Sequence, residues 1–197
     1  MKLVFATNNL NKLSEIRSML SPDIEILSLK DINCNEELPE TNPTLQQNAV
    51  QKARFVFENY GFDCFADDTG LEIDELGGDP GVYSARYSGE NSNAKKNIDK
   101  VLNKLKGNDI RAASFRTVIA LIIKGNEDVF EGVCSGNISK LEYGTNGFGY
   151  DPVFIPNGFK KTFAEMTMKE KSCISHRAKA VSKLVAFLNS YKAKATS

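Results

Sequence analysis

Strand-like and helix-like patterns alternate along the first part of this chain, and this alternation limits its fold more than any other feature. Residues 2–6 form a nearly continuous apolar run, which is typical of a buried strand. Leu10 and the apolar residues that follow it every three or four positions predict the buried face of a helix that ends before Pro22. Residues 24–29 predict a second strand. This order of elements is typical of an α/β domain.

The middle of the chain continues the alternation. Thr44 and Gln47 have the spacing of a capping box, and a helix is predicted from there to about Asn59. Two short strands are predicted next, at 63–66 and 71–76, with a polar segment between them.

The second half of the chain adds a hairpin to this order. A helix is predicted at 93–105, a long hairpin from 115–123 and 127–138, and a last helix at about 175–190. Early alternation followed by a hairpin predicts one α/β domain, residues 1–197, around a mixed, twisted sheet.

Composition excludes several classes of protein. Lys plus Arg and Asp plus Glu both number 25, and a net charge of zero argues against a protein that grips nucleic acid by charge. Four widely spaced cysteines and one histidine argue against a zinc site, and such scattered thiols suit a reducing cytoplasm. No apolar run approaches the length of a membrane span, and Met1 is not followed by a signal sequence. We therefore expect a cytoplasmic protein without nucleic-acid or membrane partners.

Two adjacent carboxylates, Asp67 and Asp68, are the strongest chemical signal. They lie at the end of a predicted strand, next to Thr69 and Gly70. Burying unpaired charge is costly, so the pair indicates a site for a divalent cation or an activated water, although a solvated turn is the alternative. If the segment stays extended, successive side chains point to opposite faces. One Asp would then face the ligand, and the other would need a structural partner.

Other polar segments fit an anionic or flat ligand. Residues 7–12 join the first strand to the first helix, where backbone N–H groups and Lys12 favour phosphate; an ordinary capped helix is the alternative. Glycines flank Phe148, which has the chemistry to stack on a base, although the motif by itself favours the alternative, a tight turn with core aromatic residues. An N-cap at Ser175 places His176 and Arg177 in a first helical turn, where cations oppose the helix dipole; this indicates a bound acceptor, although an incidental basic turn is the alternative.

Six motifs occur along the chain in one order. They are Thr-x-Asn-x-x-Lys from Thr7, Glu40, Ala-Asp-Asp-Thr-Gly-Leu from Ala66, Pro-Gly-Val-Tyr-Ser-Ala-Arg-Tyr from Pro80, Gly-Phe-Gly-Tyr-Asp-Pro-x-Phe from Gly147, and Ile-Ser-His-Arg from Ile174. Over essentially its full length the chain resembles the inosine/xanthosine triphosphate pyrophosphatases, and most of all their bacterial branch.

The resemblance implies a fold and an activity. The implied fold is a long mixed sheet with flanking helices and two lobes around a central cleft, and the implied assembly is a homodimer. The implied reaction is Mg²⁺-dependent hydrolysis of inosine, deoxyinosine and xanthosine triphosphates to the monophosphate and pyrophosphate, which cleanses the nucleotide pool.

The resemblance also implies roles for particular residues. Asp68 takes the position of proton acceptor and metal ligand, and Glu40 is a second acid near the metal. The implied substrate-binding residues are Thr7, Asn8, Asn9, Leu10, Asn11, Lys12, Thr69, Phe148, Gly149, Tyr150, Asp151, Lys171, His176 and Arg177. One position departs from the family, because Gln47 stands where bacterial members commonly have Glu. We expect this change to weaken Mg²⁺ binding without changing the reaction.

Two alternatives remain beside this assignment. One is a pyrophosphatase of the septum-inhibitor (Maf-like) group, which acts on modified pyrimidine nucleotides; the Ser-His-Arg segment from Ser175 argues against it. The other is a nucleotide sensor without turnover, which has little use for two adjacent acids. The residues alone do not decide between attack on the α-phosphorus, which releases pyrophosphate, and attack on the γ-phosphorus, which releases orthophosphate.

Overall fold

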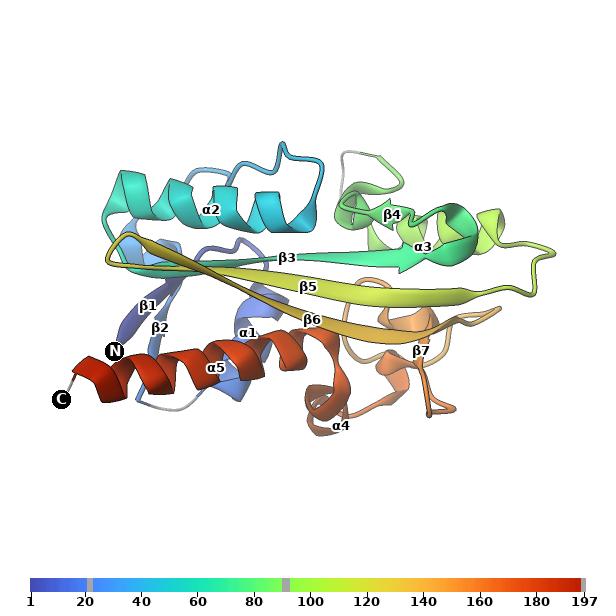
Figure 1. Cartoon of the computed structure of the whole chain (residues 1–197). Coiled ribbons are helices and arrows are strands. Elements are labelled where there is room, and N and C mark those ends of the chain that lie inside the picture. Colours follow the sequence, from blue (N-terminus) through green and yellow to red (C-terminus); the bar gives the residue numbers. More distant parts are fainter. Residues whose placement is uncertain (21–22, 90–92, 196–197) are drawn as a thin grey trace. The chain divides into compact units, whose positions relative to one another are not determined.

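The structure, a computed structural model, describes residues 1–20, 23–89 and 93–195 (Figure 1). The strands are β1 (Lys2–Phe5), β2 (Glu25–Leu27), β3 (Cys64–Ile73), β4 (Pro80–Gly81), β5 (Ala112–Ile123), β6 (Asn126–Ile138) and β7 (Phe154–Pro156). The α-helices are α1 (Leu10–Met19), α2 (Leu45–Tyr60), α3 (Ala94–Lys104), α4 (Met168–Ile174) and α5 (His176–Ala195). Short 3₁₀ helices lie at Lys30–Ile32, Asp74–Leu76, Ser84–Arg86, Asp151–Val153 and Phe163–Glu165.

The strands form one mixed sheet in the order β2-β1-β3-β5-β6-β7, with β4 paired to β3. β1 runs parallel to both β2 and β3, whereas β4 is antiparallel to β3 and β7 is antiparallel to β6. Lys124 and Gly125, both at positive φ, form the tight turn that joins β5 to β6. The prediction of an α/β fold around a mixed sheet with flanking helices is therefore confirmed.

The chain divides into two compact units, each with its own core. Unit 1 comprises Met1–Asp68, Thr117–Gly132 and Arg177–Ser197, and unit 2 comprises Thr69–Arg116 and Val133–His176. The central strands β3, β5 and β6 each contribute residues to both units.

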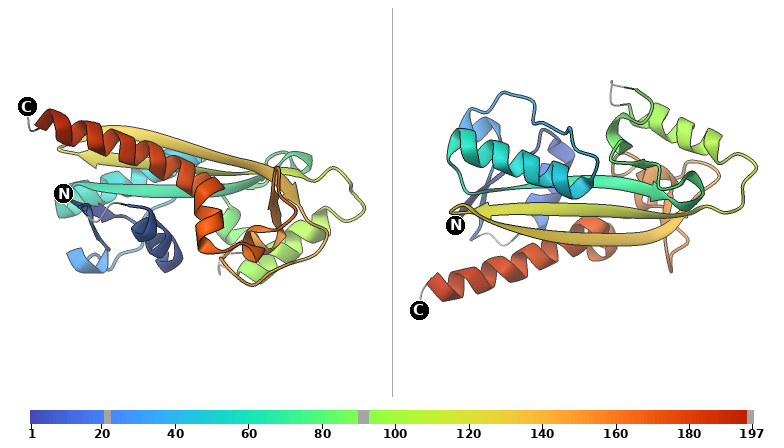
Figure 2. Two further views of the ribbon diagram at one scale, coloured as in Figure 1. Left: turned by 90° about the horizontal axis from the view of Figure 1, so that it is seen from below. Right: turned by 45° about the horizontal axis from the view of Figure 1, so that its top comes forward.

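In unit 1 the strands are covered by helices on both faces. α2 lies on one face and α5 on the other (Figure 1), and α1 lies on the same face as α5 (Figure 2). Phe5 and Phe65 stack with ring centroids 4.7 Å apart in the core beneath α1 and α5. On the α2 face, the thiol of Cys64 donates to the carbonyl oxygen of Ala53 in α2 at 3.1 Å. Because strand side chains alternate, each strand of unit 1 presents one row of residues to each helical layer.

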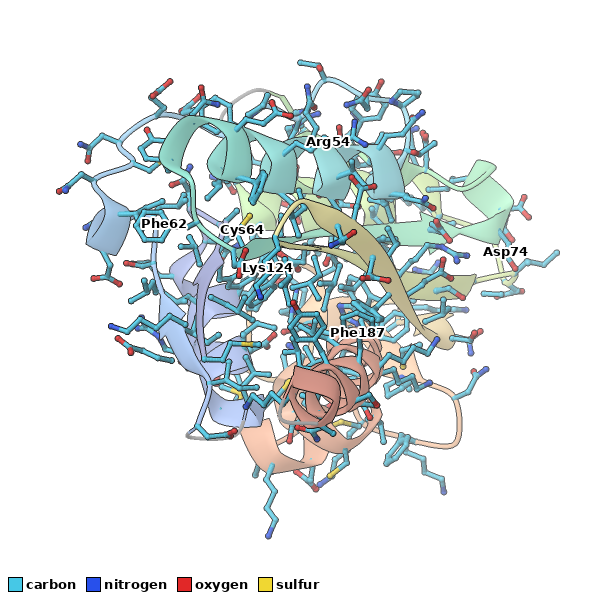
Figure 3. All side chains as sticks on the ribbon, turned by 60° about the vertical axis from the view of Figure 1, so that its left-hand side comes forward. Arg54, Phe62, Cys64, Asp74, Lys124 and Phe187 are labelled. Atoms are coloured by element: carbon cyan, nitrogen blue, oxygen red, sulfur yellow. The ribbon has the colours of Figure 1, made fainter. Side chains whose placement is uncertain are left out.

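Two contacts of unit 1 join β6 to helices on its two faces. Figure 3 labels the helix residue of each contact, Arg54 and Phe187. Arg54 of α2 forms a 3.0 Å ion pair with Glu127 near the start of β6. Phe187 of α5 packs against Phe130 of β6, with ring centroids 5.4 Å apart.

In unit 2 the core is rich in aromatic residues. Phe115 of β5 packs edge-on against Phe154 of β7, with centroids 4.7 Å apart, and Phe163 packs against both rings. α3 contributes Ile98 and Val101 to the same cluster.

The structure corrects three predictions about local structure. The two strands predicted at 63–66 and 71–76 are one continuous strand, β3, so Asp67 and Asp68 lie within a strand rather than at its end. Leu10 was predicted to be buried but is 71% exposed, because it is the first residue of α1. α4 was not predicted, although its capping box of Thr167 and Glu170 is visible in the sequence.

Within the described part of the chain, no helix is both long and apolar enough to cross a membrane.

Candidate functional site

The turn between β1 and α1 presents its polar groups to solvent. Asn9 is the N-cap of α1, and its side-chain oxygen accepts from the backbone N–H groups of Asn11 and Lys12 at 3.0 and 3.2 Å. Thr7 in turn accepts from the backbone N–H of Asn9 at 3.1 Å. Residues 8–11 are all exposed. The turn is thus held in shape by its own side chains while its outer surface stays open to a ligand.

β3 directs Asp67 and Asp68 to opposite faces of unit 1. Asp67 pairs with Lys12 of α1 and Arg177 of α5, which cover one face. Asp68 pairs with Lys52 of α2, which covers the other face. This geometry confirms the prediction that an extended segment separates the two acids and gives one of them structural partners.

Asp67 is a fully buried, ionised carboxylate. Only 1% of it is exposed. One carboxylate oxygen accepts from Lys12 Nζ at 2.9 Å, and the other accepts from Nε and Nη2 of Arg177 at 3.3 Å. Burial acts to raise the pKa of Asp67, but the charges of Lys12 and Arg177 outweigh burial and hold the pKa well below its usual range.

Asp68 lies in a different environment. Lys52 Nζ lies 3.3 Å from one of its carboxylate oxygens and 2.6 Å from an oxygen of Glu40, so the ammonium bridges the two acids. Burial, opposed by Lys52, raises the pKa of the Asp68 carboxyl above its ordinary value. The second oxygen, Oδ2, is buried and has no hydrogen-bond partner. Leaving a buried carboxylate oxygen unpaired is costly, so this atom is available to a ligand.

Asp68 and Glu40 together could hold a divalent cation. No group of three or more His, Cys, Asp or Glu side chains with the geometry of a metal site occurs among the residues that the structure describes. Mg²⁺ is usually held by one or two carboxylates together with substrate phosphates and water, so two acids are sufficient. The buried, unpartnered Oδ2 of Asp68 and the half-buried carboxylate of Glu40, joined through Lys52, form such a set.

In unit 2, three predicted substrate residues come together. Lys171 Nζ donates to Asp151 Oδ2 at 2.7 Å and lies 5.0 Å from the ring centroid of Phe148. The same Asp151 oxygen accepts from the backbone N–H of Phe148 at 2.9 Å. Gly147 permits this turn, because it has a φ of 76° and a Cβ there would collide with the Asp151 carboxylate.

Other predicted residues of unit 2 are fixed by the protein itself. The hydroxyl of Tyr150 donates to the carbonyl oxygen of Ser84 at 2.9 Å. The buried ring of His176 stacks on Phe115 with centroids 4.5 Å apart. Thr69 and Gly149 are half-buried.

The partners of Arg177 differ from those predicted from its place in the helix. Arg177 lies in the first turn of α5, as predicted, but the acceptors for its charge belong to the protein: Nη1 donates to Glu15 at 2.5 Å, and the rest of the guanidinium contacts Asp67. Only 1% of Arg177 is exposed. The bound acceptor expected for this cation is therefore not required, because Glu15 and Asp67 accept its hydrogen bonds, and the position of Arg177 gives no support to a contact with a base.

Two charged residues of the site were not predicted from the sequence. Lys52 lies on the buried face of α2, between the inward-facing Ala49 and Ala53, and Glu15 lies beside the buried Ile16 of α1. A charged residue at an inward position of an amphipathic helix was the available signal, because such a charge needs a partner in the core.

The whole chain matches known proteins. Residues 3–187 match the Ham1 family. A dITP/XTP pyrophosphatase of Christiangramia forsetii is 56% identical over 189 residues, which cover 96% of this chain and 100% of that protein. One of Flavobacterium johnsoniae is 54% identical and covers 98% of this chain and 100% of its own.

Solved structures agree with these sequence matches. The Staphylococcus aureus Ham1 protein superimposes with a TM-score of 0.88 at 38% identity, covering 97% of this chain and 100% of its own. A nucleoside-triphosphatase, dITP/XTP pyrophosphatase, of Mycobacterium abscessus superimposes with a TM-score of 0.77 at 40% identity, covering 94% of this chain and 99% of its own.

Proposed function

Because the chain belongs to the Ham1 family, we propose that it hydrolyses non-standard purine nucleoside triphosphates to the monophosphate and pyrophosphate. The substrates are deoxyinosine, inosine and xanthosine triphosphates. One observation carries the proposal. Asp68 presents a buried carboxylate oxygen without a hydrogen-bond partner, next to Lys52 and Glu40, in a chain whose relatives are named for this activity.

Asp68 and Glu40 would hold a magnesium ion. When bound, Mg²⁺ would offset the negative charge of the phosphates and of the leaving group. Both acids lie in unit 1 with Lys52. A polyphosphate bound there would meet two carboxylates and only one ammonium, and the ion would offset the remaining negative charge. Gln47, in the first turn of α2, accepts from Thr44 through its side chain. The expectation that Gln47 weakens Mg²⁺ binding without changing the reaction remains a prediction.

Asp68 has the properties of a proton acceptor. In the metal-free protein burial raises the pKa of the Asp68 carboxyl, and a more basic carboxylate takes a proton from water more readily. A carboxylate oxygen has two lone-pair directions, so the unpartnered Oδ2 could contact the ion with one and accept a hydrogen bond from that water with the other. Asp68 would thus orient the attacking water and receive its proton. Attack on the α-phosphorus, which the family resemblance favours, releases pyrophosphate.

The phosphates would be bound by the turn before α1. Residues 8–11 are exposed there, and Lys12 adds a cation whose side chain is 14% exposed. Phosphoryl transfer depends mainly on positioning and on charge stabilisation, and a fixed turn with a fixed lysine supplies both.

The nucleoside contacts remain predictions. Thr69, Phe148, Gly149, Tyr150, Asp151, Lys171, His176 and Arg177 are proposed for them on the resemblance. Hypoxanthine and xanthine carry a carbonyl at position 6 where adenine carries an amino group, so hydrogen-bond donors at that position would reject adenine. Lys171 is such a donor. A cytoplasmic location and a homodimer likewise remain predictions.

A substrate assay tests the proposal. The protein is incubated with Mg²⁺ and deoxyinosine, xanthosine, adenosine or guanosine triphosphate, and pyrophosphate and orthophosphate are measured separately. We expect pyrophosphate from the first two substrates and little turnover of the last two. Orthophosphate as the main product would contradict attack on the α-phosphorus. Turnover of modified pyrimidine triphosphates in preference to purines would favour the Maf-like alternative, and binding without turnover would favour a sensor.

A further inference from the structure

Glu15 is a buried acid for which the proposed reaction gives no role. It lies on α1, three residues after Lys12, and only 4% of it is exposed. Its carboxylate oxygen Oε2 accepts from Arg177 Nη1 at 2.5 Å. Burying a carboxylate is costly even when it is paired with a cation. Packing alone therefore does not explain why this pair lies in the core.

The contacts of Glu15 belong to a circuit of four side chains in unit 1, in which three ion pairs are joined at their ends by the backbone of α1. Glu15 binds Arg177, Arg177 binds Asp67, Asp67 binds Lys12, and Lys12 returns to the same helix as Glu15. Two cations and two anions alternate around the circuit, and their charges cancel.

The four members differ in their access to solvent. The side chains of Arg177, Glu15 and Asp67 are 2%, 5% and 0% exposed, whereas that of Lys12 is 14% exposed. Lys12 is therefore the member of the circuit that an incoming anion can reach. The other three are buried, and one of them, Asp67, accepts a hydrogen bond from the ammonium of Lys12.

We infer that Glu15 is a positioning residue, which acts through Arg177 and Asp67 to hold Lys12 in place for a triphosphate. Arg177 donates to Asp67 and to Glu15, so Glu15 draws part of the guanidinium away from Asp67. Without the Glu15 charge, Arg177 competes fully for the Asp67 carboxylate, and Lys12 loses its anchor. The inference rests on the proposed role of Lys12 in binding phosphates.

Simple electrostatics predicts the opposite result. Removing an anion from the circuit leaves a net charge of +1, and this charge alone should strengthen binding of a polyanion. A positioning role predicts weaker binding in spite of the added positive charge. The sign of the change in affinity therefore separates the two explanations.

The test is a double-mutant cycle read by calorimetric binding of inorganic triphosphate. The proteins are the wild type, Glu15→Gln, Lys12→Met and the double variant. We expect Glu15→Gln to weaken binding about tenfold when Lys12 is present, the scale of a partly lost charge-assisted contact. In the Lys12→Met background, Glu15→Gln should change binding less than about twofold, since the residue it positions is gone. Tighter binding by Glu15→Gln, or an equal loss in both backgrounds, would overturn the inference.

Two further variants control for folding. Glu15→Asp keeps the charge and should recover part of the affinity. Glu72→Gln removes a carboxylate that pairs with Arg116 at 3.0 Å in unit 2, and it should leave triphosphate affinity unchanged. Each variant is also checked by thermal unfolding. If Glu15→Asp loses as much affinity as Glu15→Gln while both remain folded, the charge of Glu15 does not position Lys12.

The binding readout is independent of turnover. If the wild type releases no pyrophosphate from deoxyinosine triphosphate, the proposed function is wrong, yet the cycle with inorganic triphosphate still tests the circuit. If the wild type is active and the cycle is additive, the proposed function stands and the positioning role is wrong.

Discussion

Asp67 and Asp68 are neighbours in one strand, yet the protein treats them in opposite ways. Asp67 faces α1 and α5, where Lys12 and Arg177 outweigh the cost of burial and lower its pKa. Asp68 faces α2, where burial outweighs Lys52 and raises its pKa, and one of its oxygens has no hydrogen-bond partner. The difference teaches that the chemistry of an acid is set by the face of the sheet on which it lies. A paired acid supports the site, and a partly unpaired acid is available for chemistry.

The largest expected effect is a loss of stability in Asp67→Asn. The substitution removes the negative charge that Lys12 and Arg177 share in the core. Breaking a buried ion pair by removing one partner typically costs about 3–5 kcal/mol of unfolding free energy. Chemical denaturation of the wild type and the variant measures this cost. Unchanged stability would mean that the pairing of Asp67 with Lys12 and Arg177 does not stabilise the fold, and the contrast with Asp68 would be wrong.

The next effect is on turnover in Asp68→Asn. The variant keeps the shape of the side chain but loses the charge proposed to bind metal and accept a proton. We expect kcat for deoxyinosine triphosphate to fall by about 10²-fold or more, the scale for loss of a preorganised electrostatic group. Steady-state kinetics with Mg²⁺ measures it. Turnover close to that of the wild type would remove Asp68 from the reaction.

A smaller effect is expected when Lys12, the partly exposed partner of Asp67, is replaced. Lys12→Met should weaken binding of the triphosphate more than binding of the monophosphate product. The difference should be about 1.5–3 kcal/mol, as for a hydrogen bond to a charged group. Calorimetry with both nucleotides measures it. Equal losses for the two nucleotides would place Lys12 next to the sugar or the base.

The smallest effect is the pH dependence of the stability of Asp68→Asn. In metal-free protein the pKa of Asp68 is raised, so the folded state favours its protonated form. Its stabilising contribution is present below the unfolded pKa of about 3.9 and is lost as pH rises through the folded pKa. As the pH rises from acid to neutral, the unfolding free energy of Asp68→Asn should therefore increase relative to that of the wild type.

The pH dependence of unfolding free energy should show the opposite trend for Asp67. Its pKa is lowered, so its stabilising contribution is present above the unfolded pKa of about 3.9 and is lost as pH falls through the folded pKa. Asp67→Asn should accordingly be destabilised most at neutral pH. Parallel pH profiles for the two variants would contradict the opposite pKa shifts.

Several features of this protein follow from the sequence alone, because they depend on local patterns. The pattern of apolar residues predicted the mixed sheet, the helix α2 and the β5–β6 hairpin, and the spacing of Thr44 and Gln47 predicted the start of α2. The period-two geometry of a strand predicted that Asp67 and Asp68 would face apart. The ordered motifs predicted the family, which the match over residues 3–187 confirms.

Tertiary structure alone decided which partners each acid receives. Arg177 and Asp67 are 110 residues apart in the chain, and Glu15 and Arg177 are 162 apart. No local pattern links such residues, so neither the circuit behind Lys12 nor the bridge of Lys52 between Asp68 and Glu40 was predicted. The same contacts explain why β3 is not interrupted at Asp67: cations from α1 and α5 stabilise its charge, so the strand does not have to leave the core there. Local sequence sets the faces of an element, and packing decides which charges meet on each face.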